Sequence, residues 1–136
     1  MRRLLPLAVL LALCSGGLAG CRKDEGPEAT YRAFAAAARA GDAATVWSLL
    51  SERSRAAFDA RAKALAASVP GAPASGKDLV LGDLAGGSPR VQKVVVVRES
   101  ADEAVVGVTV SGAPDGPPAE VRLVREGGRW RVVTPG

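Results

Sequence analysis

Apolar side chains recur at helical spacing in the part of the chain that follows residue 26. The first set keeps an i, i+3, i+4, i+7 spacing and comprises Tyr31, Phe34, Ala35 and Ala38. This spacing places the four side chains on one face of a helix. Proline suits the first turn of a helix and glycine its end, so we predict a helix that begins at Pro27 and stops at Gly41.

Two more helices are predicted before residue 70. Asp42 is a natural N-cap for the first of them. The apolar residues of this helix are Val46, Trp47, Leu49 and Leu50. Ser51 is the N-cap of the other helix, and Pro70 ends it. The apolar face of this third helix consists of Phe58, Ala62, Leu65 and Val69.

Residues 70–89 are rich in glycine, proline, serine and alanine, a composition typical of a connection. We predict a loop here, with one short strand near residues 79–81. A connection of about twenty residues is unusual in a compact domain. Two interpretations remain open for it, a solvated connection and a mobile segment that serves as a binding lid.

The last third of the chain alternates between apolar and polar side chains, as strands do. Four strands are expected, at residues 91–98, 104–110, 120–126 and 129–133. Gly127-Gly128 predicts a two-residue hairpin turn, which pairs Glu126 with Arg129. This register puts Leu123, Trp130 and Val132 on the buried face of the sheet. The opposite face then carries Arg122 and Arg131. Helices followed by such a meander predict an α+β fold with the helices packed on one sheet face.

Residues 1–20 predict an export signal. Arg2 and Arg3 precede ten apolar residues, and Ser15-Gly16-Gly17 then breaks the helix. The segment Leu18-Ala19-Gly20-Cys21 resembles the lipobox of bacterial lipoproteins at all four positions. The resemblance implies that a diacylglycerol is attached to the Cys21 sulfur and that Cys21 becomes the first mature residue.

The lipobox divides the chain into a signal peptide (1–20), a lipidated N-terminus with its linker (21–27) and a folded domain (28–136). In enterobacterial lipoproteins an aspartate after the cysteine favours retention in the inner membrane. Arg22 therefore favours an outer-membrane location facing the periplasm. Two alternatives remain: an ordinary secretory signal that leaves Cys21 as a free thiol, and an uncleaved anchor, although a span needs about 20 apolar residues.

The composition excludes several classes of function. The chain has 18 basic and 14 acidic residues, and removal of the leader lowers the net charge from +4 to +2. This small, scattered charge predicts no nucleic-acid partner. Histidine is absent, which removes the commonest general base and zinc ligand. Asp42 is expected to act as a cap and Asp59 to lie in solvent. We therefore expect no catalytic residue, metal or cofactor.

The order of segments resembles the nuclear transport factor 2-like superfamily, a cone-shaped, cystatin-like roll with a curved antiparallel sheet. The likeness rests on the helix with Tyr31 and Phe34, on the run from Ala40 to Ser51, and on the final hairpin at residues 124–132. It covers residues 28–134. Some members are isomerases, cyclases or dehydratases that work in a pocket inside the cone, and many only bind a ligand or a partner.

The leading hypothesis is a non-catalytic envelope lipoprotein, anchored through Cys21, whose domain binds a partner protein or a small apolar ligand. Tyr31 and Trp47 are the candidate ligand-binding residues, although large aromatic side chains on such faces usually belong to the core. One alternative is an isomerase- or hydrolase-like enzyme that uses Tyr31 and a carboxylate in the cone. Another is a structural or assembly component that docks through its exposed sheet face.

Overall fold

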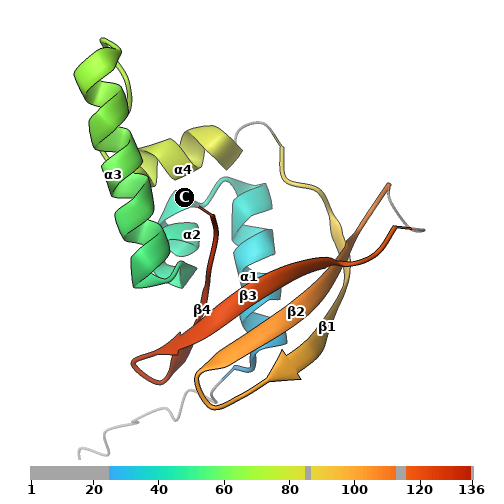
Figure 1. Cartoon of the computed structure of the whole chain (residues 1–136). Helices are drawn as coiled ribbons and strands as arrows, with labels where there is room; N and C mark the ends of the chain where they lie inside the picture. The colour runs from blue at the N-terminus through green and yellow to red at the C-terminus, as the bar shows by residue number, and fades with distance from the viewer. Residues whose placement is uncertain (1–24, 85–86, 113–115, 136) are drawn as a thin grey trace, which may run out of the picture.

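A computed structural model describes residues 25–84, 87–112 and 116–135 of the chain. The helices are α1 (Pro27–Ala40), α2 (Ala43–Leu49), α3 (Glu52–Ser68) and α4 (Gly76–Leu84). The strands are β1 (Val91–Glu99), β2 (Glu103–Val110), β3 (Ala119–Glu126) and β4 (Arg129–Val132). Four N-terminal helices thus pack against a four-stranded antiparallel sheet, and the predicted α+β class is confirmed (Figure 1).

The predicted helix boundaries before residue 70 are confirmed by their caps. Gly41 ends α1 in the left-handed conformation, with a φ of 69°. The Asp42 side chain then accepts a hydrogen bond from the Thr45 backbone N–H at 3.0 Å, as an N-cap does. Ser51 caps α3 in the same way, because its hydroxyl accepts from the Ser54 N–H at 3.2 Å.

The sheet is a simple meander in the order β1-β2-β3-β4. Gly127 and Gly128 have φ values of 57° and 75°, which a two-residue hairpin turn of this kind requires. The predicted register is confirmed, since Glu126 faces Arg129 and Leu123 faces Val132 across the hairpin. The sheet is neither closed nor strongly curled, so the expected deep cone is not formed.

Two apolar clusters make up the core, one among the helices and one between α1 and the sheet. The first contains Ala37, Ala38, Val46, Leu50, Phe58, Ala62, Leu79 and Val80. The second contains Val94, Ala104, Val106, Val108, Leu123, Trp130 and Val132, with Tyr31 against it. Phe34 of α1 packs against both clusters. All residues of the two clusters lie between positions 31 and 132. A chain that lacks the first 24 residues therefore keeps every described core residue.

The prediction of a loop with a short strand between residues 70 and 89 is wrong, because residues 76–84 form α4. Leu79 and Val80 of this helix are only 6% and 4% exposed and belong to the helical cluster. The Ser75 hydroxyl accepts from the Asp78 N–H at 3.2 Å and donates to its carboxylate at 2.7 Å. Ser75 followed three positions later by the acidic Asp78 is a sequence pattern typical of a helix start, and it predicts the start of α4.

Asp59 is exposed, as expected, and it also connects two helices. Its Oδ1 accepts a hydrogen bond from the Gly76 backbone N–H at 2.9 Å and so ties the start of α4 to α3. Val69, predicted on the buried face of α3, is 49% exposed because it lies beyond the last helical turn. None of the described helices is long and apolar enough to cross a membrane.

Candidate binding groove

An open groove lies between α3 and the C-terminal segment that follows β4. Its volume is about 670 Å³. The residues that line it come from α3, from β3 and from the end of the chain: Arg53, Ala57, Ala60, Arg61, Arg122, Val133, Thr134 and Pro135. Figure 1 shows the chain beyond β4 running back from the last hairpin toward the helices, near α3. The groove therefore joins segments about 80 residues apart.

The α3 wall of the groove is a second face of that helix, beside the face buried in the core. Arg53, Ala57 and Arg61 are spaced by four residues and so lie on one side of α3. The core side carries Ser54, Phe58 and Ala62, each shifted by one position. The alanines leave a hollow because their side chains are short, and the arginines stand at its two ends.

The C-terminal wall is held in place by a buried hydroxyl. The Ser54 hydroxyl accepts from the Thr134 N–H at 3.0 Å and donates to the Thr134 carbonyl at 3.2 Å. The Ser51 N–H donates to the Val132 carbonyl at 2.9 Å. At the same end, both carboxylate oxygens of Glu126 accept from the Glu52 N–H at 3.1 Å. The start of α3 is thus fixed to the last hairpin, which gives the groove a defined shape.

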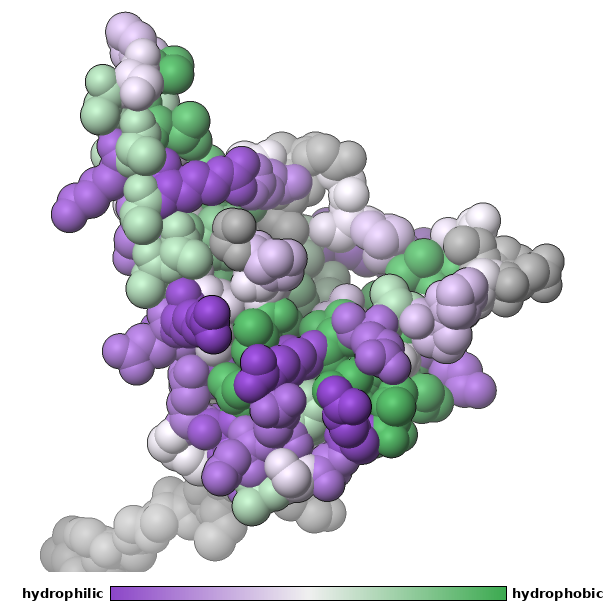
Figure 2. All heavy atoms as spheres, in the orientation of Figure 1, coloured by the Kyte–Doolittle hydropathy of each residue, from purple (hydrophilic) through white to green (hydrophobic). Residues whose placement is uncertain are grey.

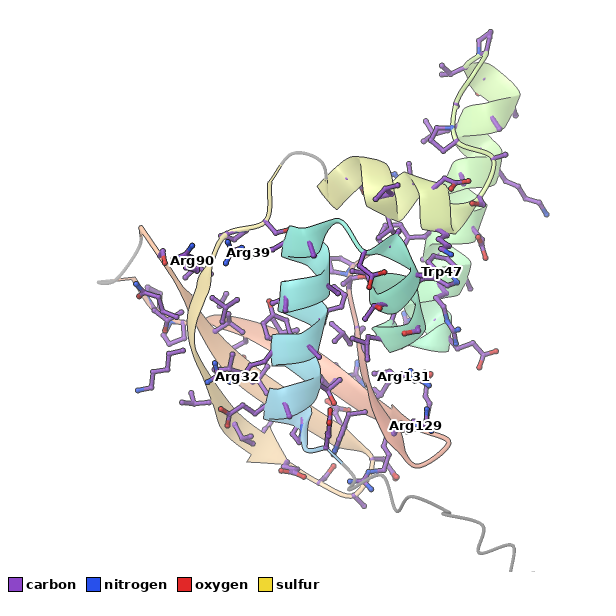
Figure 3. The ribbon with its side chains drawn as sticks, turned by 180° about the vertical axis from the view of Figure 1, so that it is seen from behind. Arg32, Arg39, Trp47, Arg90, Arg129 and Arg131 are labelled. Carbon is purple, nitrogen blue, oxygen red and sulfur yellow. The ribbon has the colours of Figure 1, made fainter. Side chains whose placement is uncertain are left out.

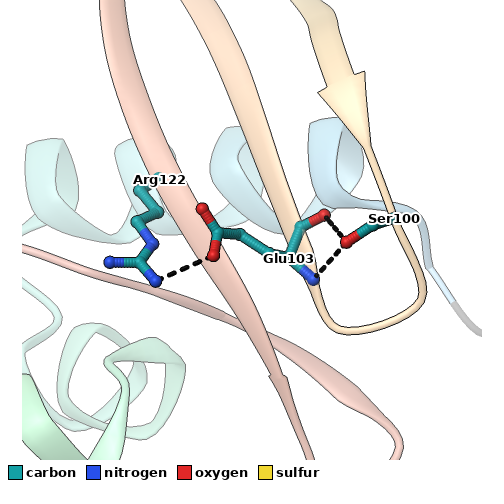
Figure 4. A network of polar contacts seen from close by, with 3 residues as sticks. All are labelled: Ser100, Glu103 and Arg122. Atoms are coloured by element: carbon teal, nitrogen blue, oxygen red, sulfur yellow. Dashed lines mark hydrogen bonds and ion pairs between the residues drawn. The ribbon is translucent and has the colours of Figure 1, made fainter.

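The three arginines of the groove differ in their partners. Arg61 forms an ion pair with Asp83 at 3.2 Å, and Arg122 forms one with Glu103 at 2.8 Å (Figure 4). All four of these side chains are roughly half exposed, so each pair is worth at most about 1 kcal/mol. The Arg53 guanidinium has no hydrogen bond or ion pair with any residue in the described part of the chain.

Thr134 lines the groove, and its hydroxyl is buried next to it. Its Oγ1 atom is buried and has no hydrogen-bond partner among the residues that the structure describes. A buried hydroxyl normally finds a partner, because its hydration is lost on folding. The backbone on both sides of this hydroxyl is already fixed by Ser54. The groove therefore carries positive charge, and one buried hydroxyl without a described partner belongs to a residue of its wall.

The residues predicted for ligand binding lie elsewhere. Tyr31 packs on the inner face of the sheet, with its ring 5.9 Å from that of Phe34, and burial raises the pKa of its hydroxyl. Trp47 lies on α2 (Figure 3) and packs against the helical cluster. Neither side chain lines the groove. Cys21 falls outside the described residues, so its role stays a prediction.

A second hollow of about 540 Å³ lies at the end of α1. It is lined by Ala38, Arg39, Ala40, Gly41, Leu81, Gly87 and Ser88. Of these, only Arg39 carries a charge, and the hollow contains no buried polar side chain that lacks a partner within the described ranges. This hollow therefore has fewer charged and polar groups that could bind a ligand than the groove beside α3 has.

The outer face of the sheet, opposite α1, is mixed in character. Val95 and Val97 are 38% and 53% exposed and close over Gly107 together with Pro118. A Cβ atom on Gly107 would lie 3.3 Å from Val97 and Pro118, so glycine permits this packing. Figure 2 shows hydrophobic surface over this part of the sheet, bordered by hydrophilic side chains toward β3. The register shift after Val96 and the charge of Lys93 interrupt the edge of β1, as in strands that avoid pairing with another chain.

The charged side chains of the groove decide what it can bind. Its ionisable side chains are arginines, whose guanidinium groups suit the binding of carboxylate or phosphate. Among residues 25–84, 87–112 and 116–135, no group of three metal-ligating side chains comes together. Sequence reasoning missed the groove, although the repeat of arginine and alanine along α3 was visible. The chain matches no protein-family model, no curated protein and no solved structure.

Proposed function

We propose that this chain is a membrane-anchored lipoprotein of the bacterial cell envelope whose domain binds a partner protein or a small ligand without catalysis. The anchor is the lipid on Cys21, and the binding site is the groove beside α3. The lipobox from Leu18 to Cys21 supports the anchor. The single observation that carries the binding role is the convergence of Arg53, Arg61 and Arg122 on one preformed hollow.

The superfamily of the domain is a second part of this proposal. We regard the domain as an open variant of the nuclear transport factor 2-like roll. Support comes from the order of its elements, with helices first and an antiparallel meander behind them. The inner face of the sheet is packed against α1 through Leu123, Trp130 and Tyr31. In such a variant the binding site is the groove beside α3 and not a pocket enclosed by the sheet.

The position of the chain ends fits this arrangement. The chain enters α1 at the end of the molecule where the β1–β2 and β3–β4 turns lie, and the C-terminal segment runs away from that end (Figure 1). The linker from Arg22 to Gly26 spans at most about 17 Å, at roughly 3.4 Å per residue. A lipid on Cys21 would therefore hold the turn end of the domain near the bilayer and leave the groove accessible.

The anchor is tested by mass spectrometry of the mature protein together with membrane fractionation. We expect a lipid-modified N-terminal Cys21 and recovery in the membrane fraction. The Cys21→Ser variant should lose both the lipid mass and the membrane association. An unmodified wild-type chain in the soluble fraction would contradict the proposed anchor.

The binding role is tested with a variant that fills the groove. Ala60 lies in the groove and is exposed, so Ala60→Trp blocks the hollow without disturbing the core. Ala64→Trp is the matched control, because Ala64 is exposed on the same helix but does not line the groove. We expect native mass spectrometry of protein purified from envelopes to show a bound species in the wild type and in Ala64→Trp, but not in Ala60→Trp. Equal occupancy in all three would place binding elsewhere.

A further inference from the structure

We infer that the groove beside α3 takes a small anion, a carboxylate or phosphate that carries a short apolar chain. The inference rests on the proposed binding function and names the chemical class of its ligand. The anionic group would lie among the Arg53 and Arg122 guanidiniums and the Thr134 hydroxyl, and the apolar chain would lie against the alanines of α3.

The charge of the groove favours an anion. Guanidinium groups bind carboxylate and phosphate through paired, charge-assisted hydrogen bonds. Arg53 has no partner within the part of the chain that is described, so it is available without breaking a contact. The pairs of Arg122 with Glu103 and of Arg61 with Asp83 are half exposed. Such pairs are weak enough for both arginines to turn toward a ligand.

The Thr134 hydroxyl gives a second, independent reason to expect an anion in the groove. Its Oγ1 atom is buried without a partner, while the Thr134 backbone is fixed by the Ser54 hydroxyl. Rotation of the Thr134 side chain about its Cα–Cβ bond would bring this hydroxyl from its buried position toward an anion in the groove. The anion would then accept a hydrogen bond from it and so remove the cost of leaving it unsatisfied. An apolar ligand would leave that cost in place.

The remaining lining favours an apolar part in the ligand. Ala57, Ala60, Val133 and Pro135 offer only carbon atoms from their side chains. A volume of about 670 Å³ lies within the range of small-molecule sites, which combine apolar walls with a few polar groups. Inorganic phosphate alone would leave this wall uncovered, so we expect it to bind more weakly than an alkyl phosphate.

Three probes that differ only in the head group test the inference: hexyl phosphate, hexanoate and hexanol. Each is titrated at neutral pH into a chain that begins at Arg22, which retains the whole described core, and amide chemical shifts are recorded. The two anions should shift the amides of Ala57, Ala60 and Thr134 saturably, and added salt should weaken the effect. Hexanol should leave these amides unchanged.

Variants then assign the binding to the named groups. Arg53→Gln should weaken hexyl phosphate binding at least about tenfold, the loss of one charge-assisted contact. Thr134→Val should also weaken it but should not lower the melting temperature, since the hydroxyl has no described partner to lose. Arg39→Gln is the control, because Arg39 is exposed outside the groove, and its affinity should equal that of the wild type.

Several outcomes would overturn the inference. Equal binding of hexanol and hexyl phosphate at the same amides would show an apolar site and leave the proposed function standing. Binding of an acidic hexapeptide in place of both small anions would assign the groove to a protein partner. If neither anion shifts the groove amides, this ligand class is wrong, and the Ala60→Trp comparison decides separately whether the groove binds anything.

Discussion

The guanidinium of Arg125 lies over the indole ring of Trp130, with its central carbon 4.8 Å from the ring centroid. The two residues face each other across the last hairpin, in the register that Gly127-Gly128 imposes. Trp130 is only 2% exposed and packs in the cluster between α1 and the sheet. Arg125 therefore covers part of the indole with its guanidinium.

Truncation of Trp130 tests its place in the core. We expect Trp130→Ala to lower the free energy of unfolding by about 3–5 kcal/mol, because a large buried side chain is lost and a cavity remains. Trp47→Ala should cost less, since Trp47 is only partly buried. Urea denaturation followed by circular dichroism measures both. An equal loss in the two variants would contradict the central role of Trp130.

Replacement of Arg125 tests the contact between guanidinium and indole. Arg125→Met keeps most of the aliphatic side chain and removes the charge. A cation–π contact at a partly exposed site contributes about 0.5–1 kcal/mol. We expect Arg125→Met to lower the free energy of unfolding by that amount when Trp130 is present. The same substitution should lower it by less when Trp130 is replaced by leucine. A double-mutant cycle on unfolding free energies measures the difference, and an additive cycle would show that the contact contributes nothing.

Two glycines of α4 should respond in opposite directions to alanine. A Cβ atom on Gly76 would lie 2.6 Å from the Asp59 backbone nitrogen and 2.8 Å from the Phe58 carbonyl carbon, so Gly76→Ala forces α4 away from α3. We expect it to cost about 1–3 kcal/mol of stability. At Gly82 no atom lies within 4 Å of an added Cβ, and Gly82→Ala should add about 0.5–1 kcal/mol through helix propensity. The melting temperatures of both variants should be measured. If both rise or both fall, the close approach at Gly76 is contradicted.

Asp42 should make the stability depend on pH in acid. Hydrogen bonds from the Thr45 hydroxyl and backbone N–H lower the pKa of the Asp42 carboxyl below its usual 3.8. A lowered pKa in the folded state gives stability above the unfolded-state pKa, and this stability is lost as the pH falls through the folded-state pKa. Asp42→Asn keeps a capping acceptor and does not titrate. The stability difference between wild type and Asp42→Asn should therefore shrink in acid, and urea titrations at a series of pH values below neutral measure it. Parallel curves would contradict this linkage.

The elements that sequence reasoning predicted well share a local origin. Asp42 and Ser51 cap helices through hydrogen bonds to residues three positions ahead. Gly127-Gly128 fixes the hairpin through backbone conformations that glycine adopts readily. In these places the residues that interact are neighbours in the sequence, so their pattern contains the information.

The elements that were missed depend on contacts between distant segments. Residues 70–89 look like a loop by composition, yet α4 forms because Asp59 accepts from Gly76 and because Leu79 and Val80 find a place among α2 and α3. Its own serine cap at Ser75 was present but was outweighed by the surrounding glycines and prolines. Tertiary packing thus overrode local composition.

The sequence by itself determined the α+β class, the helix boundaries before residue 70 and the register of the last hairpin, because each follows from local caps, turns and periodicity. It also predicts the lipid anchor, because Leu18–Cys21 resembles a lipobox, and such a short linear motif is read without reference to the fold. Only the tertiary structure decided where a binding site can lie. The groove exists because Ser54 fixes Thr134 beside α3 and because Arg122 reaches it from β3. Contacts between residues this far apart in the chain leave no periodic trace in the sequence, since the fold alone brings them together.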